Sequence, residues 1–137
     1  MNDTIVIGSQ TRHIEELIKH LSTEFALKDL GPLHYFLKVE VHMTSTDLMI
    51  TQEKYAKEIL NKANMLEATQ FSTPIAISNS LSPNDHEKVD ATEYRSVVGS
   101  LQYLTLTRPD IQFAVNKVCQ HRQEPTLKDL KAVKCIL

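Results

Sequence analysis

The sequence predicts an α+β fold in which a small, mostly antiparallel sheet precedes a helical bundle. Three observations predict this fold: apolar and polar residues alternate over 35–43, apolar residues recur at helical spacing on both sides of that stretch, and a polar, unpatterned stretch interrupts the helical spacing. The chain of 137 residues is one compact domain or a piece of something longer, which excludes two full-sized domains. Its apolar share of 42% allows a core to form.

The first two predicted elements are a strand and a helix. Residues 4–7 form a short aliphatic and β-branched run that ends at a Gly-Ser pair, a pattern typical of a buried strand. Apolar residues then recur at helical spacing between Thr11 and Phe25, with charged residues facing away, which predicts an amphipathic helix. We expect this helix to lie across the sheet.

A hairpin and a second helix are predicted next. Strict alternation over 35–43 indicates one half-buried strand, and residues 48–50 supply the return strand. Thr51 is a suitable N-cap for a helix that starts at Gln52 and ends near Asn64. The hairpin and the first strand together would give a sheet of three strands.

The rest of the chain is predicted to be a linker followed by helices. Residues 71–91 are rich in Ser, Pro, Asn and Asp without periodicity, which indicates a flexible linker. Helical spacing resumes at Tyr94, breaks before Pro109 and then returns. A last helix opens at Thr126, where Asp129 three residues later makes a capping-box pattern.

Charge is distributed unevenly along the chain. Residues 1–94 hold 8 Lys and Arg against 14 Asp and Glu, a net charge of −6, whereas residues 95–137 hold 7 against 3, a net charge of +4. A basic end on an acidic body hints at a polyanionic partner, because basic residues near phosphates release condensed counterions. A solvated helix surface is the alternative explanation.

Spacing alone assembles no catalytic or metal site. The sequence contains no Gly-rich phosphate loop, no HExxH, no GxSxG and no CxxC pair. We expect Cys119 and Cys135 to be buried thiols, and His13 and His20 to be solvated. No apolar run is long enough to span a membrane, and the amino terminus lacks signal-peptide features, which predicts a soluble, intracellular chain without a membrane partner.

Five strings of residues occur in an order and spacing that resemble a known family. They read IVIGS, EFALKDLGPLHYFLKVEV, MITQEKYAKEIL, STPIA and YRSVVGSLQYLTLTRPDIQFAVNKVCQ, and together they cover nearly the whole chain. This pattern resembles the reverse transcriptase of copia-type LTR retrotransposons, which is part of their Pol polyprotein. The resemblance implies a segment that runs from the catalytic turn of the palm, through the thumb, into the connection that precedes ribonuclease H.

The resemblance also implies an organisation for the chain. Residues 1–51 would be a truncated palm remnant with the hairpin, 52–70 a thumb-like helix, 71–91 the linker and 92–137 a helical thumb or connection segment. The hairpin resembles the primer grip, where the family reads Phe-Leu-Gly and this chain has Lys38 in place of the glycine. Lys38 is therefore a candidate phosphate contact, with a solvent-facing strand lysine as the alternative.

The family's catalytic turn carries two adjacent aspartates, which hold two Mg²⁺ ions together with a third aspartate from an earlier palm strand. Here Asp3 falls on one aspartate position and Asn2 replaces the other. An amide is a poorer magnesium ligand than a carboxylate. The resemblance therefore implies that Asp3 is a catalytic and metal-ligating remnant, that Mg²⁺ is the family cofactor but is not bound productively here, and that this chain alone does not polymerise DNA.

A template–primer of RNA and DNA is the partner that the resemblance implies. In polymerases the thumb and connection follow the nucleic-acid backbone, so basic side chains there are candidates for phosphate contact. Together with the hairpin lysine, the candidates are Lys38, Arg95, Lys117, Arg122, Lys128, Lys131 and Lys134. Arg108 is a further candidate, but we expect it to pair with Asp110, which would also cap the helix that follows, and contact with nucleic acid is the alternative.

Three functions remain open from the sequence. The first is a catalytically incomplete reverse transcriptase remnant with at most weak, non-specific nucleic-acid binding. The alternative is a domesticated module that binds a protein partner and has no nucleic-acid role, and the third is a polymerase completed by a second chain. An exposed edge of the truncated sheet would also favour self-association.

Overall fold

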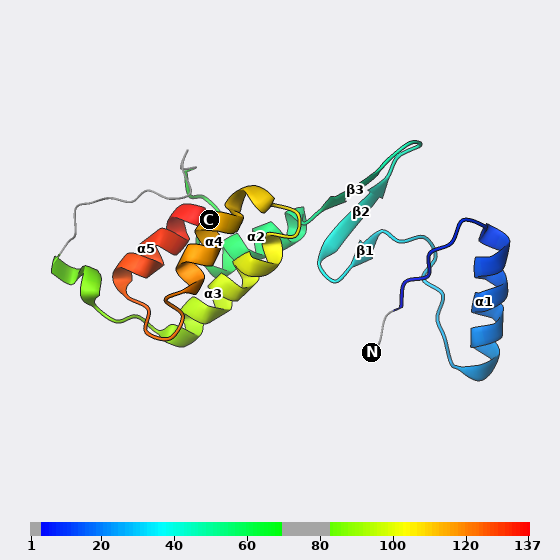
Figure 1. The fold of residues 1–137 in the computed structure, drawn as a ribbon, viewed down its shortest axis with the longest axis horizontal. Helices are drawn as coiled ribbons and strands as arrows, with labels where there is room; N and C mark the ends of the chain where they lie inside the picture. The colour runs from blue at the N-terminus through cyan, green and yellow to red at the C-terminus, as the bar shows by residue number, and fades with distance from the viewer. Residues whose placement is uncertain (1–3, 70–82) are drawn as a thin grey trace.

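The computed structural model describes residues 4–69 and 83–137, and its parts are arranged along one long axis (Figure 1). Helix α1 lies at one end, the strands lie in the middle, and α2 to α5 pack together at the other end. The predicted α+β class is confirmed. The elements are α1 (Thr11–Glu24), β1 (Tyr35–Phe36), β2 (Val39–Met43), β3 (Leu48–Thr51), α2 (Glu53–Lys62), the 3-10 helix η1 (Pro83–His86), α3 (Ala91–Leu104), the 3-10 helix η2 (Pro109–Ile111), α4 (Gln112–Cys119) and α5 (Leu127–Ile136).

The sheet is an antiparallel meander with the strand order β1-β2-β3. Its register places only Leu37 and Lys38 between β1 and β2. Both have positive φ angles, 46° and 67°, as the type I′ turn of a two-residue hairpin requires. The prediction of one strand over 35–43 is therefore wrong, because alternating residues fit two strands with a tight turn as well as one strand.

The segment before the sheet differs from the prediction in two ways. Residues 4–7 belong to no strand, and Ile7 is 90% exposed. An apolar run becomes a strand only where a neighbour pairs with its backbone, and no strand in the described ranges does so here. Helix α1 forms as predicted, but it lies apart from the sheet and buries none of its residues, so it does not cross the sheet (Figure 1).

Helix α2 begins differently from the prediction. Thr51 is the last residue of β3, and Gln52 occupies the N-cap without a side-chain cap bond. The cap comes from the sheet instead: Oε2 of Glu40 on β2 accepts hydrogen bonds from the backbone N–H of Glu53 at 3.1 Å and of Lys54 at 3.4 Å. A carboxylate at this end also complements the helix dipole.

The core lies among α2, α3, α4 and α5, which with η1 and η2 form the helical part. The break before Pro109 and the capping box of Thr126 and Asp129 are both confirmed. The end of α2 near Asn64 is also confirmed, since the helix ends at Lys62 and Asn64 has a φ of 54°. The buried cluster comprises Ile59, Tyr94, Val97, Val98, Leu101, Leu104, Ile111, Val115, Val118 and Val133.

The polar stretch over 71–91 lies partly outside the described residues, which resume at position 83. There Pro83–His86 forms η1 in contact with α5, and Lys88 makes an isolated antiparallel bridge with Thr126. The side chain of Asp85 is 7% exposed and lies 2.7 Å from Nζ of Lys131. The last residues of the stretch therefore pack against the helical part, and the rest of the predicted linker lies outside the described residues.

Candidate nucleic-acid interface

The position that the family resemblance assigns to catalysis falls outside the described residues. Both Asn2 and Asp3 precede residue 4, where the described part begins. Within 4–69 and 83–137, no three His, Cys, Asp or Glu side chains come together in a way that could hold a metal ion.

Lys38, at the hairpin turn, lies against the helical part. Its Nζ is 2.7 Å from Oε2 of Glu58 on α2 and 6.0 Å from the ring centroid of Tyr55. The hydrogen bond with Glu58 raises the pKa of Lys38. The hydroxyl of Tyr103 on α3 donates a hydrogen bond to the carbonyl of Leu37, and its ring meets Tyr55 edge to face. The turn is therefore attached to α2 and α3, and the lysine charge already has a partner.

The three candidate lysines of α5 differ in their surroundings. Lys131 forms the ion pair with Asp85, so its charge offsets a nearly buried carboxylate. Lys128 and Lys134 are exposed, and neither forms an ion pair within the part of the chain that the structure describes. Two lysines of this helix are therefore available to an external anion, and the third has a structural role.

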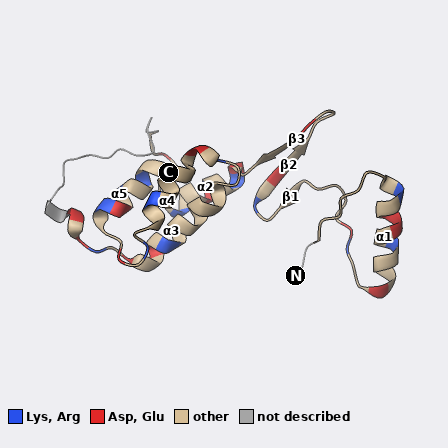
Figure 2. Cartoon of the chain, in the orientation of Figure 1, with Lys and Arg blue, Asp and Glu red and all other residues tan. Residues whose placement is uncertain are grey.

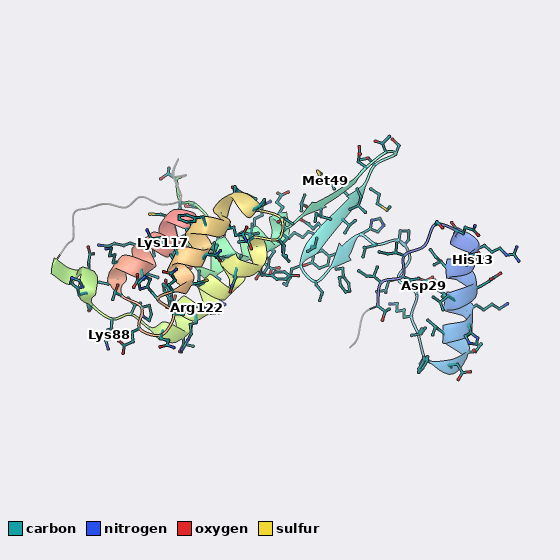
Figure 3. The ribbon with its side chains drawn as sticks, in the orientation of Figure 1. His13, Asp29, Met49, Lys88, Lys117 and Arg122 are labelled. Carbon is teal, nitrogen blue, oxygen red and sulfur yellow. The ribbon has the colours of Figure 1, made fainter. Side chains whose placement is uncertain are left out.

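The remaining candidates come from α3, α4 and the loop after α4. Arg95 and Lys117 are exposed and Arg122 is half-buried, and none of the three pairs with an acidic residue in the described ranges. Figure 2 shows basic segments on each of α3, α4 and α5, and Figure 3 labels Lys117 and Arg122. Five of the seven candidates thus have no acidic partner among the described residues: Arg95, Lys117, Arg122, Lys128 and Lys134.

Arg108 pairs with Asp110 as predicted. The guanidinium donates from Nε to Oδ1 at 2.9 Å and from its terminal nitrogen to Oδ2 at 2.7 Å. This pairing lowers the pKa of Asp110 and raises the pKa of Arg108. Asp110 is not the N-cap, however, because Arg108 holds that position of η2 and Asp110 lies inside its first turn. The 3-10 helix already begins at Pro109, so its N-cap is Arg108, two residues before the expected cap.

The chain matches the reverse transcriptase (RNA-dependent DNA polymerase) family over residues 1–77, more than half of its length. It belongs to this family. Over its whole length this reverse transcriptase chain is 44% identical to an uncharacterized mitochondrial protein of Arabidopsis thaliana, of which it covers 57%. It is also 41% identical to the retrovirus-related Pol polyprotein from transposon RE1 of the same plant and 35% identical to that from transposon TNT 1-94 of Nicotiana tabacum.

These relatives confirm the resemblance to copia-type retrotransposons. The reverse transcriptase chain covers 9% of the RE1 polyprotein and 11% of the TNT 1-94 polyprotein, so it corresponds to a small part of each. It spans little more than half of the Arabidopsis mitochondrial protein. No solved structure matches it. No helix in the described ranges has the length and apolar character needed to cross a membrane.

Sequence reasoning missed two features of this reverse transcriptase chain and misjudged a third. Glu40 caps a helix, which no local pattern indicates because its partners are far away in the sequence. Phe113 on α4 is 74% exposed, although helical spacing could have placed it opposite the buried Ala114 and Val115. The two cysteines are free, and both are half-buried rather than buried as expected.

Proposed function

We propose that this reverse transcriptase segment binds nucleic acid weakly and without sequence preference through its helical part. One observation carries the proposal: five predicted cations have no acidic partner among the described residues, namely Arg95, Lys117, Arg122, Lys128 and Lys134. An unpaired cation beside a phosphate gains by counterion release, whereas a paired cation must first separate from its carboxylate. The net charge of +4 over residues 95–137 favours the same partner.

The salt dependence of binding tests this proposal. We expect the affinity for an RNA–DNA hybrid to fall roughly 150-fold between about 50 mM and about 200 mM salt, because neutralising four phosphates gives a slope of about −3.6 in log affinity against log salt concentration. Lys117→Gln should reduce the slope by about 1. Lys38→Gln is the matched control and should leave the slope unchanged, since Glu58 already pairs with Lys38. Binding that is absent at low salt, or that salt does not weaken, contradicts the proposal.

We also propose that the segment does not polymerise DNA by itself. The family resemblance places Asn2 where a metal-binding aspartate is needed, and its neutral amide cannot offset the charge of a divalent ion. Primer extension by the purified chain with Mg²⁺ should therefore yield no product. Calorimetry should show equal Mg²⁺ binding for the parent and Asp3→Asn. Templated extension by the parent chain would overturn this part of the proposal.

A second candidate function, binding of a protein partner, is favoured by a different observation. Helix α1 is strongly amphipathic yet buries none of its residues, and Leu17 and, just past its end, Phe25 are exposed. An apolar helix face that no described element covers can serve as an interaction site. A complex recovered from cells that resists nuclease and is lost in Leu17→Glu supports this function. A complex that nuclease treatment disrupts is held together by nucleic acid and contradicts this function.

The edge of the sheet supports a proposal of self-association. β3 is the last strand in the order, so no other described strand pairs with its outer side. Its residues Leu48, Met49 and Ile50 are exposed (Figure 3 labels Met49). An uncovered apolar edge is a template for pairing with another chain. Size-exclusion chromatography should show a concentration-dependent dimer that Met49→Lys weakens, and a monomer at every concentration contradicts the proposal.

A further inference from the structure

Helix α4 has an exposed face on which an aromatic ring lies among amides and a lysine. A rotation of about 100° per residue places Gln112, Phe113, Asn116, Lys117 and Gln120 on one side of the helix, and all five are exposed. The other side packs into the core. In the described helical part, no other large apolar side chain is as exposed as Phe113, at 74%. An aromatic ring in water among polar neighbours favours a ligand that covers the ring.

The charge along this face has one sign. Residues 111–123 contain no Asp or Glu but include Lys117, His121 and Arg122. Lys117 follows Phe113 by one helical turn, so the two side chains are neighbours on the helix surface. The nearest preceding acid, Asp110, is already paired with Arg108 through two hydrogen bonds. The face therefore suits a partner that carries negative charge and flat apolar surfaces.

The polar side chains beside the ring are available for hydrogen bonds to a ligand. Gln112, Asn116, Lys117 and Gln120 make no side-chain hydrogen bond to any residue in the described ranges. Each amide has both donors and an acceptor, which matches the mixed donors and acceptors on a nucleobase edge. A protein partner could offer carboxylates to the lysine and apolar side chains to the ring. The exposed amides, however, match a nucleobase edge more specifically than they match a protein surface.

We infer that this face of α4 binds unpaired bases of a single-stranded nucleic acid, with Phe113 stacking on a base and Lys117 contacting a phosphate. The inference deepens the proposed function and rests on it. A duplex keeps its base faces stacked within the helix, so the ring gains little from duplex. A single strand exposes base faces, and aromatic stacking on them is tolerant of sequence. The face should therefore prefer single strands to the hybrid duplex.

The test compares two single strands that carry the same number of phosphates. One is oligo(dT) of about 20 nucleotides, and the other is an abasic strand of the same length. The parent chain should bind oligo(dT) roughly tenfold more tightly than the abasic strand, which is the size of a typical base–aromatic stacking contribution. Phe113→Ala should lose this preference and Phe113→Tyr should keep it. Oligo(U) in place of oligo(dT) should give the same pattern, because stacking does not read the sugar.

A fluorescent reporter locates the contact on the protein. The chain contains no tryptophan, so Phe113→Trp introduces a single tryptophan at the proposed site, which can be excited selectively beside the four tyrosines. Leu30→Trp is a matched control, because Leu30 is 72% exposed and lies in the acidic part of the chain. Oligo(dT) should quench the tryptophan emission of Phe113→Trp and leave the tryptophan emission of Leu30→Trp unchanged. Circular dichroism should show equal helix content in both variants and in Phe113→Ala.

The outcomes separate this inference from the proposed function. Equal, salt-dependent binding of oligo(dT) and the abasic strand by the parent overturns the role of Phe113 but leaves phosphate binding in place. If none of the strands shows salt-dependent binding, both the inference about Phe113 and the proposed nucleic-acid binding are overturned. Loss of a protein complex in Phe113→Ala with unchanged oligo(dT) binding also overturns the inference, since it assigns the face to a protein.

Discussion

Oε2 of Glu40, in β2, accepts a hydrogen bond from the backbone N–H of Glu53 at 3.1 Å. The same carboxylate lies 3.7 Å from the ammonium of Lys54, and its side chain is only 14% exposed. A residue of the sheet thus satisfies a donor at the start of α2 that Gln52, at the N-cap, leaves open. This contact fixes the direction in which the chain passes from the sheet into the helical part.

Removal of this cap should destabilise the chain. We expect Glu40→Ala to lower the free energy of unfolding by about 1 kcal/mol, the usual cost of a lost helix cap. Urea denaturation followed by circular dichroism measures it. The matched control is Glu16→Ala on α1, where the carboxylate is exposed and pairs with Arg12, and the expected change is within about 0.5 kcal/mol. Equal effects at both positions would show that Glu40 is not acting as a cap.

The turn at Leu37 and Lys38 should favour glycine at its second position. Lys38 has a φ of 67°, which a residue with a Cβ atom adopts only at some cost. Lys38→Gly and Lys38→Ala both remove the contact with Glu58, but only glycine relieves the backbone. We expect Lys38→Gly to be more stable than Lys38→Ala by about 1 kcal/mol. Denaturation midpoints compare them, and a more stable alanine variant contradicts the turn geometry.

Replacement of Lys131 should lower the stability of the fold more than replacement of its neighbour Lys128. Lys131 lies 2.7 Å from the nearly buried carboxylate of Asp85, and we expect Lys131→Gln to destabilise by about 1–2 kcal/mol, because this charge then loses a close partner. Lys128→Gln, one turn away on α5, should change stability by less than about 0.5 kcal/mol. Thermal denaturation distinguishes the two variants. In binding assays the order should reverse, with Lys128→Gln the weaker binder of nucleic acid under conditions where both variants are folded.

Tyr94 should make stability depend on alkaline pH. Its hydroxyl donates to the carbonyl of Val118 at 2.8 Å, and burial raises the pKa of the Tyr94 phenol. Because the folded pKa lies above the unfolded one, the contribution of Tyr94 is complete below about pH 10 and decreases as the pH rises above it. Tyr94→Phe should cost about 1 kcal/mol at neutral pH. The difference from the parent should shrink above about pH 10, and a difference that grows there contradicts the assignment.

Features set by neighbouring residues could be predicted from the sequence. The buried face of α3 follows from the spacing of Tyr94 and the apolar residues after it. Arg108 and Asp110 are separated by a single residue, so their pairing is a local feature of the sequence. The attachments of Lys38 to Glu58 and of Lys131 to Asp85 join residues distant in the sequence, and no periodicity carries that information. The predicted strand over 4–7 failed for the same reason, because a strand depends on a partner elsewhere.

The buried cluster takes all of its members from positions 59 to 133 in the described ranges, and none from α1 or the residues before it. Apart from Ile59 of α2, the interior of the helical part is therefore built from one continuous stretch, residues 94–133, which is less than a third of the 137 residues. Substitutions, or even lost codons, upstream of the hairpin would leave that interior unchanged. The residues that hold α4 in place are therefore separate from everything before the hairpin, and the outer face of α4 stays exposed to the solvent.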